Sequence, residues 1–364
     1  MNIRTKNTFF FGLTFVFYAL AAFTFLTWLT GCTPAGGSQT NEAGDKAPIT
    51  LILAAYTTPR EAYRELIPIF QEQWREQTGQ EVIFEESYQA SGAQSRAVLE
   101  GFEADIVALS LEADIIRLED AGLITNDWRS QPFGGMVSTS VVAFAVREGN
   151  PNGIQDWADL AQPGLEILTP NPKTSGGAMW NILGLLGAVQ RGHVEGFSAD
   201  DAGAQDFLLA VLENVTVMDK SARDSIINYE KGIGDVAITY ENEVLVGQQA
   251  GQTYELVLPT STMQIDNPIA IVDTYVDKHG TREVAEAFIE FLFTPESQEV
   301  FAKYGLRSPD PAVAEKTADV YPPITDLFTI AHFGGWKEAT PTYFGETGIF
   351  YKVFAQVTGI TITE

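Results

Sequence analysis

The strongest constraint on the fold is a repeated alternation of strand and helix patterns over residues 49–303. A short apolar run at 49–55 predicts a strand, and the amphipathic stretch at 59–77 predicts a helix. This alternation is typical of α/β proteins, in which helices cover parallel sheets. We therefore predict an α/β fold with parallel sheets. Ligands in such folds bind beyond the carboxyl ends of the strands, where helices begin.

Two local expectations accompany this pattern. The order of Thr58, Pro59 and Glu61 predicts a helix start with Thr58 as the cap, in the manner of a capping box. Further on, the apolar run at 270–276 predicts a strand.

The N-terminus has the features of a secretory signal. Arg4 and Lys6 precede a largely apolar run, which ends in the sequence LTGC at Cys32. This ending resembles the bacterial lipoprotein signal, so Cys32 is the expected lipidation site and residues 1–31 the signal peptide. The apolar run is also long enough for an uncleaved transmembrane anchor, and that alternative stays open. Either alternative places the folded part outside the cytoplasmic membrane, tethered by a flexible linker over 32–47.

Charge and cysteine content exclude several classes of function. The chain carries 48 acidic and 22 basic residues, for a net charge of −26, which argues against nucleic acid as a partner. Cys32 is its single cysteine, so no disulfide framework and no cysteine-based metal site are expected. An anionic ligand remains possible, because surface charge is screened over about 8 Å at physiological salt.

Four junctions share one pattern, in which a strand is followed by small or hydroxyl residues and then by a helix start. The first turn of a helix has unpaired N–H groups and a partial positive charge, so several starts aimed at one point can hold an anion without lysine. Taken singly, each junction is also explained by ordinary capping or turn chemistry. The four junctions are at 56–58, 90–92, 174–177 and 220–223.

Four longer motifs carry a family resemblance. They are NPNGIQDWADL (150–160), PNPKTSGGAMWN (170–181), GIGDVAITYENEVL (232–245) and LFTIAHFGGW (327–336). Together they resemble the sulfate- and thiosulfate-binding proteins of bacterial ABC importers. The resemblance implies a two-lobed periplasmic-binding-protein fold of type II, with a ligand cleft between the lobes and two crossovers near 139–144 and 239–243. It implies the lobe boundaries 48–138 plus 244–320 and 139–243, with a C-terminal segment, 321–364, packing on the lobes.

The same resemblance implies a set of ligand-binding residues. In that family a dehydrated oxyanion is held by backbone amides and a few side-chain donors. Carried over by motif, the contributors are the backbone groups of Thr57, Gly176, Gly177 and Ala222, the hydroxyl of Ser91, and the side chain of Tyr240. Arg223 is expected to brace the backbone through a carboxylate and is not in this set.

Tyr240 departs from the pattern of the family. The resemblance implies tryptophan here in sulfate binders and an apolar residue in thiosulfate binders. Tryptophan only donates hydrogen bonds, whereas the tyrosine hydroxyl both donates and accepts. A donor-only site rejects phosphate, because the proton of that anion then faces no acceptor. We therefore expect Tyr240 to donate to sulfate, with looser rejection of phosphate.

Thr57 is a second departure from the family pattern. The resemblance implies aspartate at this position in sulfate binders, and a contact through the backbone tolerates the change.

Residues for catalysis are sparse. No nucleophile elbow, zinc-protease motif or phosphate-loop motif occurs. The histidines at 193 and 279 are expected at the surface and His332 in packing, and the Glu241/Glu243 pair is expected to complement a helix dipole. We expect no catalytic residue, metal or cofactor.

The sequence therefore predicts a monomeric, lipid-anchored extracytoplasmic protein that binds sulfate and delivers it to the membrane permease of an ABC importer. Thiosulfate or molybdate as the main ligand, or an oxyanion sensor without transport, are the alternatives.

Overall fold

The computed structural model describes residues 46–359. The expected signal peptide, Cys32 and all but the last two residues of the expected linker lie outside this range, as do residues 360–364. Among the described residues, no helix has the length and apolarity needed to cross a membrane.

One mixed sheet forms the framework, with the order β2-β1-β3-β9-β4-β7-β5-β6, while β8 pairs with β4 and β10 with β9. Its strands are β1 (Lys46–Tyr56), β2 (Gln80–Gln89), β3 (Ile106–Ala108), β4 (Met136–Val146), β5 (Ile167–Pro170), β6 (Val215–Asp219), β7 (Val236–Tyr240), β8 (Glu255–Val257), β9 (Ser261–Ile271) and β10 (Asp326–Phe328).

Thirteen α-helices and four short 3-10 helices are present among the described residues. The α-helices are α1 (Arg60–Thr78), α2 (Ser91–Leu99), α3 (Glu112–Asp120), α4 (Gly176–Gln190), α5 (Asp201–Asn214), α6 (Ala222–Glu230), α7 (Glu241–Gln249), α8 (Asp273–His279), α9 (Arg282–Leu292), α10 (Pro295–Lys303), α11 (Pro311–Lys316), α12 (Trp336–Phe344) and α13 (Ile349–Thr358). The 3-10 helices are η1 (Trp128–Ser130), η2 (Pro132–Gly135), η3 (Trp157–Ala161) and η4 (Ile330–Phe333).

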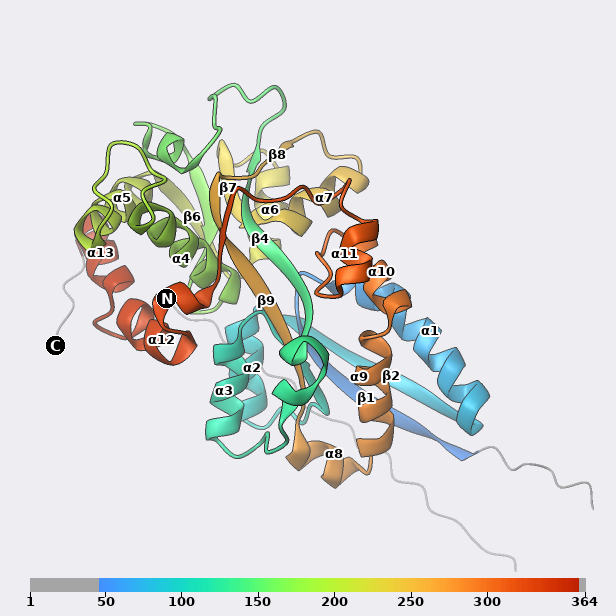
Figure 1. The fold of residues 1–364 in the computed structure, drawn as a ribbon. Coiled ribbons are helices and arrows are strands. Elements are labelled where there is room, and N and C mark those ends of the chain that lie inside the picture. Colours follow the sequence, from blue (N-terminus) through green and yellow to red (C-terminus); the bar gives the residue numbers. More distant parts are fainter. Residues whose placement is uncertain (1–45, 360–364) are drawn as a thin grey trace, which may run out of the picture. The chain divides into compact units, whose positions relative to one another are not determined.

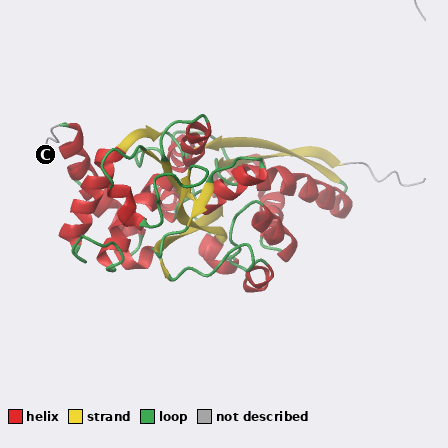
Figure 2. Cartoon of the chain, turned by 90° about the horizontal axis from the view of Figure 1, so that it is seen from above, coloured by secondary structure: helices red, strands yellow, loops and turns green. Residues whose placement is uncertain are grey.

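Helices cover both faces of the sheet, as Figure 2 shows. Alternate residues of β1 face opposite ways: Leu51 and Leu53 pack with α1 and α9, whereas Ala54 packs with α2 and α3. Such a strand is apolar on both faces, which is why it reads as a continuous apolar run. The α/β prediction is confirmed.

The prediction of parallel sheets is confirmed only in part, because the sheet is mixed. The pairs β1–β2, β1–β3, β5–β6 and β5–β7 are parallel, but β9 is antiparallel to β3 and β4, and β4 is antiparallel to β7. The two long strands β4 and β9 pair with each other in the middle of the sheet (Figure 1). Residues 239–243, where a second crossover is expected, form the end of β7 and the start of α7.

Two further local predictions are wrong. The strand expected at 270–276 is shifted, because β9 ends at Ile271 and α8 begins at Asp273. The first helix begins at Arg60 after Pro59, and no side chain caps it. The Oγ1 atom of Thr58 is buried without a hydrogen-bond partner among the described residues.

The C-terminal segment continues the core of β4, β5 and β7. Strand β10 pairs with the start of β9, and Phe328, Trp336 and Phe350 are buried in the same apolar cluster as α4 and α5. The ring of Trp336 meets that of Trp180 edge to face, with centroids 4.7 Å apart.

Candidate functional site

A small buried cavity lies where several strands end and several helices begin. Its volume is about 10 Å³ for the centre of a water-sized molecule, so its walls lie close together. All six residues that the sequence predicts for the ligand site line it, so the structure brings them together from five separate segments. The lining consists of Tyr56, Thr57, Thr58, Ala90, Ser91, Ser110, Ser175, Gly176, Gly177, Ser221, Ala222 and Tyr240.

Three helices begin at this cavity, and its lining has no charged side chain. The first residues of α2, α4 and α6 are Ser91, Gly176 and Ala222, and all three contribute to the wall. The first-turn N–H groups of a helix have no acceptor within the helix, and the helix dipole makes this end positive. The arrangement therefore suits an anion that is neutralised by dipoles rather than by a cation.

The two adjacent glycines allow the walls to approach each other closely. A Cβ atom on Gly176 would lie 2.7 Å from the Oγ of Ser110, and one on Gly177 would lie 2.8 Å from the Cε2 of Tyr240. Both distances are shorter than any ordinary carbon contact, so a side chain at either position would push the walls apart. The glycine pair thus has a packing role within the site as well as leaving the backbone uncovered.

Ser91 does not present its hydroxyl as a free donor. Its Oγ donates to the Oδ2 of Asp114 over 2.5 Å and accepts from the backbone N–H of Ser110 over 3.0 Å. Arg117 in turn donates to Asp114 over 2.7 Å. Because its proton is engaged by a carboxylate, this hydroxyl is not free to donate to a ligand in this structure, in contrast to the expectation.

Tyr240 is paired with a residue that the sequence reasoning missed. Its hydroxyl lies 2.6 Å from the Oγ of Ser110, and either atom can be the donor. Burial raises the pKa of Tyr240 above its ordinary value, so the phenol stays protonated. Ser110 lies two residues after the end of β3, at the carboxyl end where ligands bind in this class of fold, and its place after the largely apolar run 104–109 could have identified it.

Ser175 and Ser221 also line the cavity and were missed as contributors. Both are the residues just before a helix, but they behave differently. The hydroxyl of Ser221 caps α6 by accepting from the backbone N–H of Asp224, and it also donates to the side-chain carboxylate of Asp224 over 2.9 Å. Ser175 makes no side-chain cap to α4. The hydroxyl of Ser175 is thus not used to cap its helix, and its place beside two glycines was the signal in the sequence.

Arg223 braces the site from behind, as expected. Its guanidinium donates to Glu243 over 2.6 Å, to Glu61 over 2.8 Å and to the carbonyl of Thr58 over 3.2 Å. Burial raises the pKa of Glu243 even though Arg223 opposes this shift. Glu241 is likewise buried and pairs with Arg307. Both carboxylates of the pair are thus bound to arginines.

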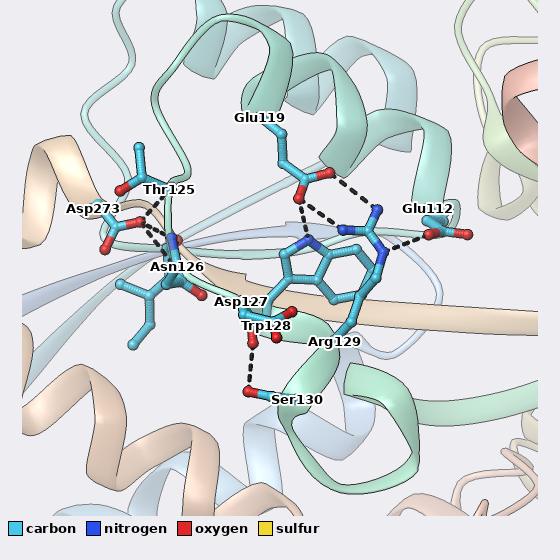
Figure 3. Close-up of polar contacts among 10 residues, drawn as sticks. Glu112, Glu119, Thr125, Asn126, Asp127, Trp128, Arg129, Ser130 and Asp273 are labelled. Atoms are coloured by element: carbon cyan, nitrogen blue, oxygen red, sulfur yellow. Dashed lines mark hydrogen bonds and ion pairs between the residues drawn. The ribbon is translucent and has the colours of Figure 1, made fainter.

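Helix α3, which carries Asp114, is held by the segment that follows it (Figure 3). Arg129 lies over the ring of Trp128, 4.2 Å from its centroid, and binds both Glu112 and Glu119. The indole N–H of Trp128 also donates to Glu119 over 3.0 Å. These contacts fix the two ends of α3 and so the position of Asp114 behind Ser91.

The histidines lie away from the cavity lining. His193 contacts Asp326 over 3.2 Å, and His332 contacts Gln190 over 3.0 Å and packs against Phe333. His279 is half-buried rather than on the surface, because it lies between Asp105 and Glu103.

The chain is similar to known proteins over nearly all of its length. Residues 51–307 match the family model of the bacterial extracellular solute-binding proteins. A "Sulfate-binding protein" of Synechococcus elongatus is 45% identical over 346 residues, covering 94% of this chain and 97% of that protein. A "Thiosulfate-binding protein" of Escherichia coli is 33% identical, and the match covers 86% of this chain and 93% of that protein. The solved structure of the sulfate-binding protein SubI from Mycobacterium tuberculosis is 38% identical with a TM-score of 0.74, covering 81% of this chain and 99% of that one.

Proposed function

Because this chain belongs to the bacterial extracellular solute-binding proteins, and within them to the sulfate/thiosulfate-binding family, we propose that it binds sulfate outside the cytoplasmic membrane and delivers it to an ABC importer. It has the two-lobed fold of periplasmic binding proteins. The relatives named for sulfate are more similar to it than those named for thiosulfate, which supports sulfate as the main ligand.

The observation that carries this proposal is the uncharged cavity at which three helices begin. Sulfate is a dianion without a proton at neutral pH, so it needs donors and no acceptor. A hydrogen bond to a charged group contributes about 1.5–3 kcal/mol net. Several such bonds from fixed backbone groups offset the loss of hydration without a lysine or arginine in the cavity.

We assign the donors from the lining. Backbone N–H groups come from the loop before α1 and from the starts of α2, α4 and α6, and hydroxyl groups come from two side chains. The backbone set is Thr57, Ser91, Gly176, Gly177 and Ala222, and the hydroxyl set is Ser175 and Tyr240.

Closure of the two lobes would complete this donor set. One wall of the cavity is built by β1, α2 and Ser110, which follows β3, and the other by α4, α6 and β7. The long strands β4 and β9 connect the two parts of the sheet and are the natural place for a hinge. The lobe boundaries at residues 138/139 and 243/244 remain predictions.

Attachment and partners are also part of the proposal. Residues 1–31 would direct export, lipidated Cys32 would anchor the protein, and the monomer would present its closed form to the permease. Extracellular action is the property shared by the solute-binding family to which the chain belongs.

The test is calorimetry on the full-length protein in mild detergent and sulfate-free buffer, titrated with sulfate, thiosulfate, phosphate and molybdate. We expect sulfate to bind most tightly, and Tyr240→Phe to weaken sulfate binding. Tighter binding of thiosulfate or molybdate would reassign the ligand. Binding of no oxyanion would contradict the proposal and leave a sensor or structural role.

A further inference from the structure

Ser110 and Tyr240 form a buried hydroxyl pair on the wall of the cavity. The two oxygens are 2.6 Å apart, and each side chain is 1% exposed. Ser110 follows β3 and Tyr240 ends β7, so the pair joins two segments that are distant in the chain. Each hydroxyl has one proton to donate and lone pairs to accept, unlike the backbone N–H groups around it.

The surroundings fix this pair in place. The backbone carbonyl of Ser110 accepts from the indole N–H of Trp180 over 2.9 Å. The backbone N–H of Ser110 donates to the Oγ of Ser91 over 3.0 Å. Gly176 and Gly177, whose added Cβ atoms would touch the Oγ of Ser110 and the ring of Tyr240, bring the start of α4 against both side chains. An anion at the start of α4 is therefore within reach of the pair.

Two other hydroxyls of the lining are already bound to carboxylates, whereas those of Tyr56 and Thr58 have no partner among the described residues and so no second hydroxyl to exchange a proton with. The hydroxyl of Ser91 donates to Asp114, and that of Ser221 donates to Asp224. In the Ser110–Tyr240 pair one proton lies in the mutual hydrogen bond, and the other remains for a ligand. Because either atom can be the donor, the two protons can shift together by rotation of the hydroxyl groups.

We propose that Ser110 and Tyr240 form a reversible donor–acceptor pair through which this site accepts a singly protonated tetrahedral oxyanion, such as hydrogen phosphate, besides a fully deprotonated one. The inference rests on the proposed function of the same cavity. It makes Ser110 a specificity-determining residue. Its role is to accept the proton of Tyr240 whenever Tyr240 itself accepts one from the ligand.

The proton positions differ between the two kinds of ligand. With sulfate, one hydroxyl donates to the other and the second donates to the anion. With hydrogen phosphate, Tyr240 accepts from the P–OH group and donates to Ser110, and Ser110 donates to another oxygen of the anion. No covalent bond changes in either case. Without the Ser110 hydroxyl, the Tyr240 proton loses its acceptor. It then turns toward the anion and meets the proton of the P–OH group.

This account predicts a change in selectivity. Ser110→Ala leaves Tyr240 able to donate to sulfate, so sulfate affinity changes little. Hydrogen phosphate loses a hydrogen bond to a charged group, which corresponds to about tenfold in affinity or more. The ratio of the phosphate Kd to the sulfate Kd should therefore rise at least about tenfold. Tyr240→Trp replaces the hydroxyl with an indole N–H, which only donates. This variant should raise the same ratio while residue 110 remains serine.

The experiment is calorimetric titration of the full-length protein in mild detergent at one fixed pH, with sulfate and with inorganic phosphate. Wild type, Ser110→Ala and Tyr240→Trp are compared. Ser308→Ala is the matched control, because Ser308 is also buried and donates to Gln298 over 2.7 Å, but it is absent from the cavity lining.

A rise in the ratio for Ser110→Ala and Tyr240→Trp, with no rise for Ser308→Ala, would support the inference. An unchanged ratio in Ser110→Ala, or a wild type that binds sulfate but not phosphate, would overturn this inference and leave the proposed function standing. If Ser110→Ala fails to fold, Tyr240→Trp decides by the same ratio. A wild-type protein that binds neither anion would overturn both proposals.

Discussion

Arg223, at the start of α6, binds the carboxylate of Glu61 on α1, with 2.8 Å between Nη1 and Oε1. The same guanidinium holds Glu243, whose side chain is 1% exposed. One arginine thus ties the loop before α1, the start of α6 and the start of α7 together behind the cavity. It shapes the proposed anion site without contributing its charge to the lining.

Arg223→Met should destabilise the protein strongly, because it leaves the buried carboxylate of Glu243 unpaired. Removing one partner of a buried ion pair costs about 3–5 kcal/mol. Urea denaturation measures the change. The control is Arg75→Met, because Arg75 pairs with Glu72 on the surface, with exposed fractions of 61% and 54%. Little or no loss is expected there, because water screens an exposed ion pair. Equal losses in both variants would contradict the bracing role.

Gly176→Ala should weaken sulfate binding far more than it changes folding. The added methyl group would meet the Oγ of Ser110 at 2.7 Å, so α4 must shift away from the cavity. Sulfate titration should show an affinity loss of about tenfold or more, since fewer donors then reach the anion. The control is Gly184→Ala in the same helix, where the nearest atoms lie at 3.4 Å. Retained affinity in Gly176→Ala would show that the close approach is not needed.

Ser175→Ala should mainly weaken sulfate binding, whereas Ser221→Ala should mainly lower the stability of the fold. Ser175 makes no side-chain cap, so its loss should reduce sulfate affinity by about tenfold and leave stability nearly unchanged. Ser221 caps α6, so its loss should cost about 1 kcal/mol of stability with a smaller effect on affinity. Calorimetry and thermal unfolding on both variants separate the two roles. The reverse pattern would assign the ligand contact to Ser221.

His279 should make stability depend on pH. Partial burial alone would lower the pKa of His279, but its bonds to Asp105 and Glu103 raise it above the ordinary value. A raised folded pKa means that protonation stabilises the fold. This contribution is fully present below about pH 6.5 and is lost as the pH rises through the folded pKa. Urea midpoints measured from pH 6 to 9 should fall more steeply for wild type than for His279→Gln. Parallel curves would contradict the prediction.

The α/β class and the four strand–helix junctions of the lining could be predicted from local rules, whereas the individual ligand residues, Tyr240 among them, were implied by the family resemblance. Apolar runs define the strands, and the cavity lies at the strand ends where the pattern places it. The bond between the Ser91 hydroxyl and Asp114 could not be predicted, because Asp114 reaches this hydroxyl from α3 only in the folded chain. The Ser110–Tyr240 pair joins residues 130 positions apart and has no signature in the sequence. The antiparallel β4–β9 pairing is likewise a long-range contact that no short window contains.

The uncharged lining of the cavity has a kinetic consequence. A chain with a net charge of −26 repels a dianion at long range, and no cation at the site attracts it. Added inert salt shortens the range of this repulsion. Capture of the anion should therefore become faster as ionic strength rises, whereas escape, which depends on short-range hydrogen bonds, should hardly change. The protein would then collect its ligand more rapidly in saline surroundings than in dilute ones.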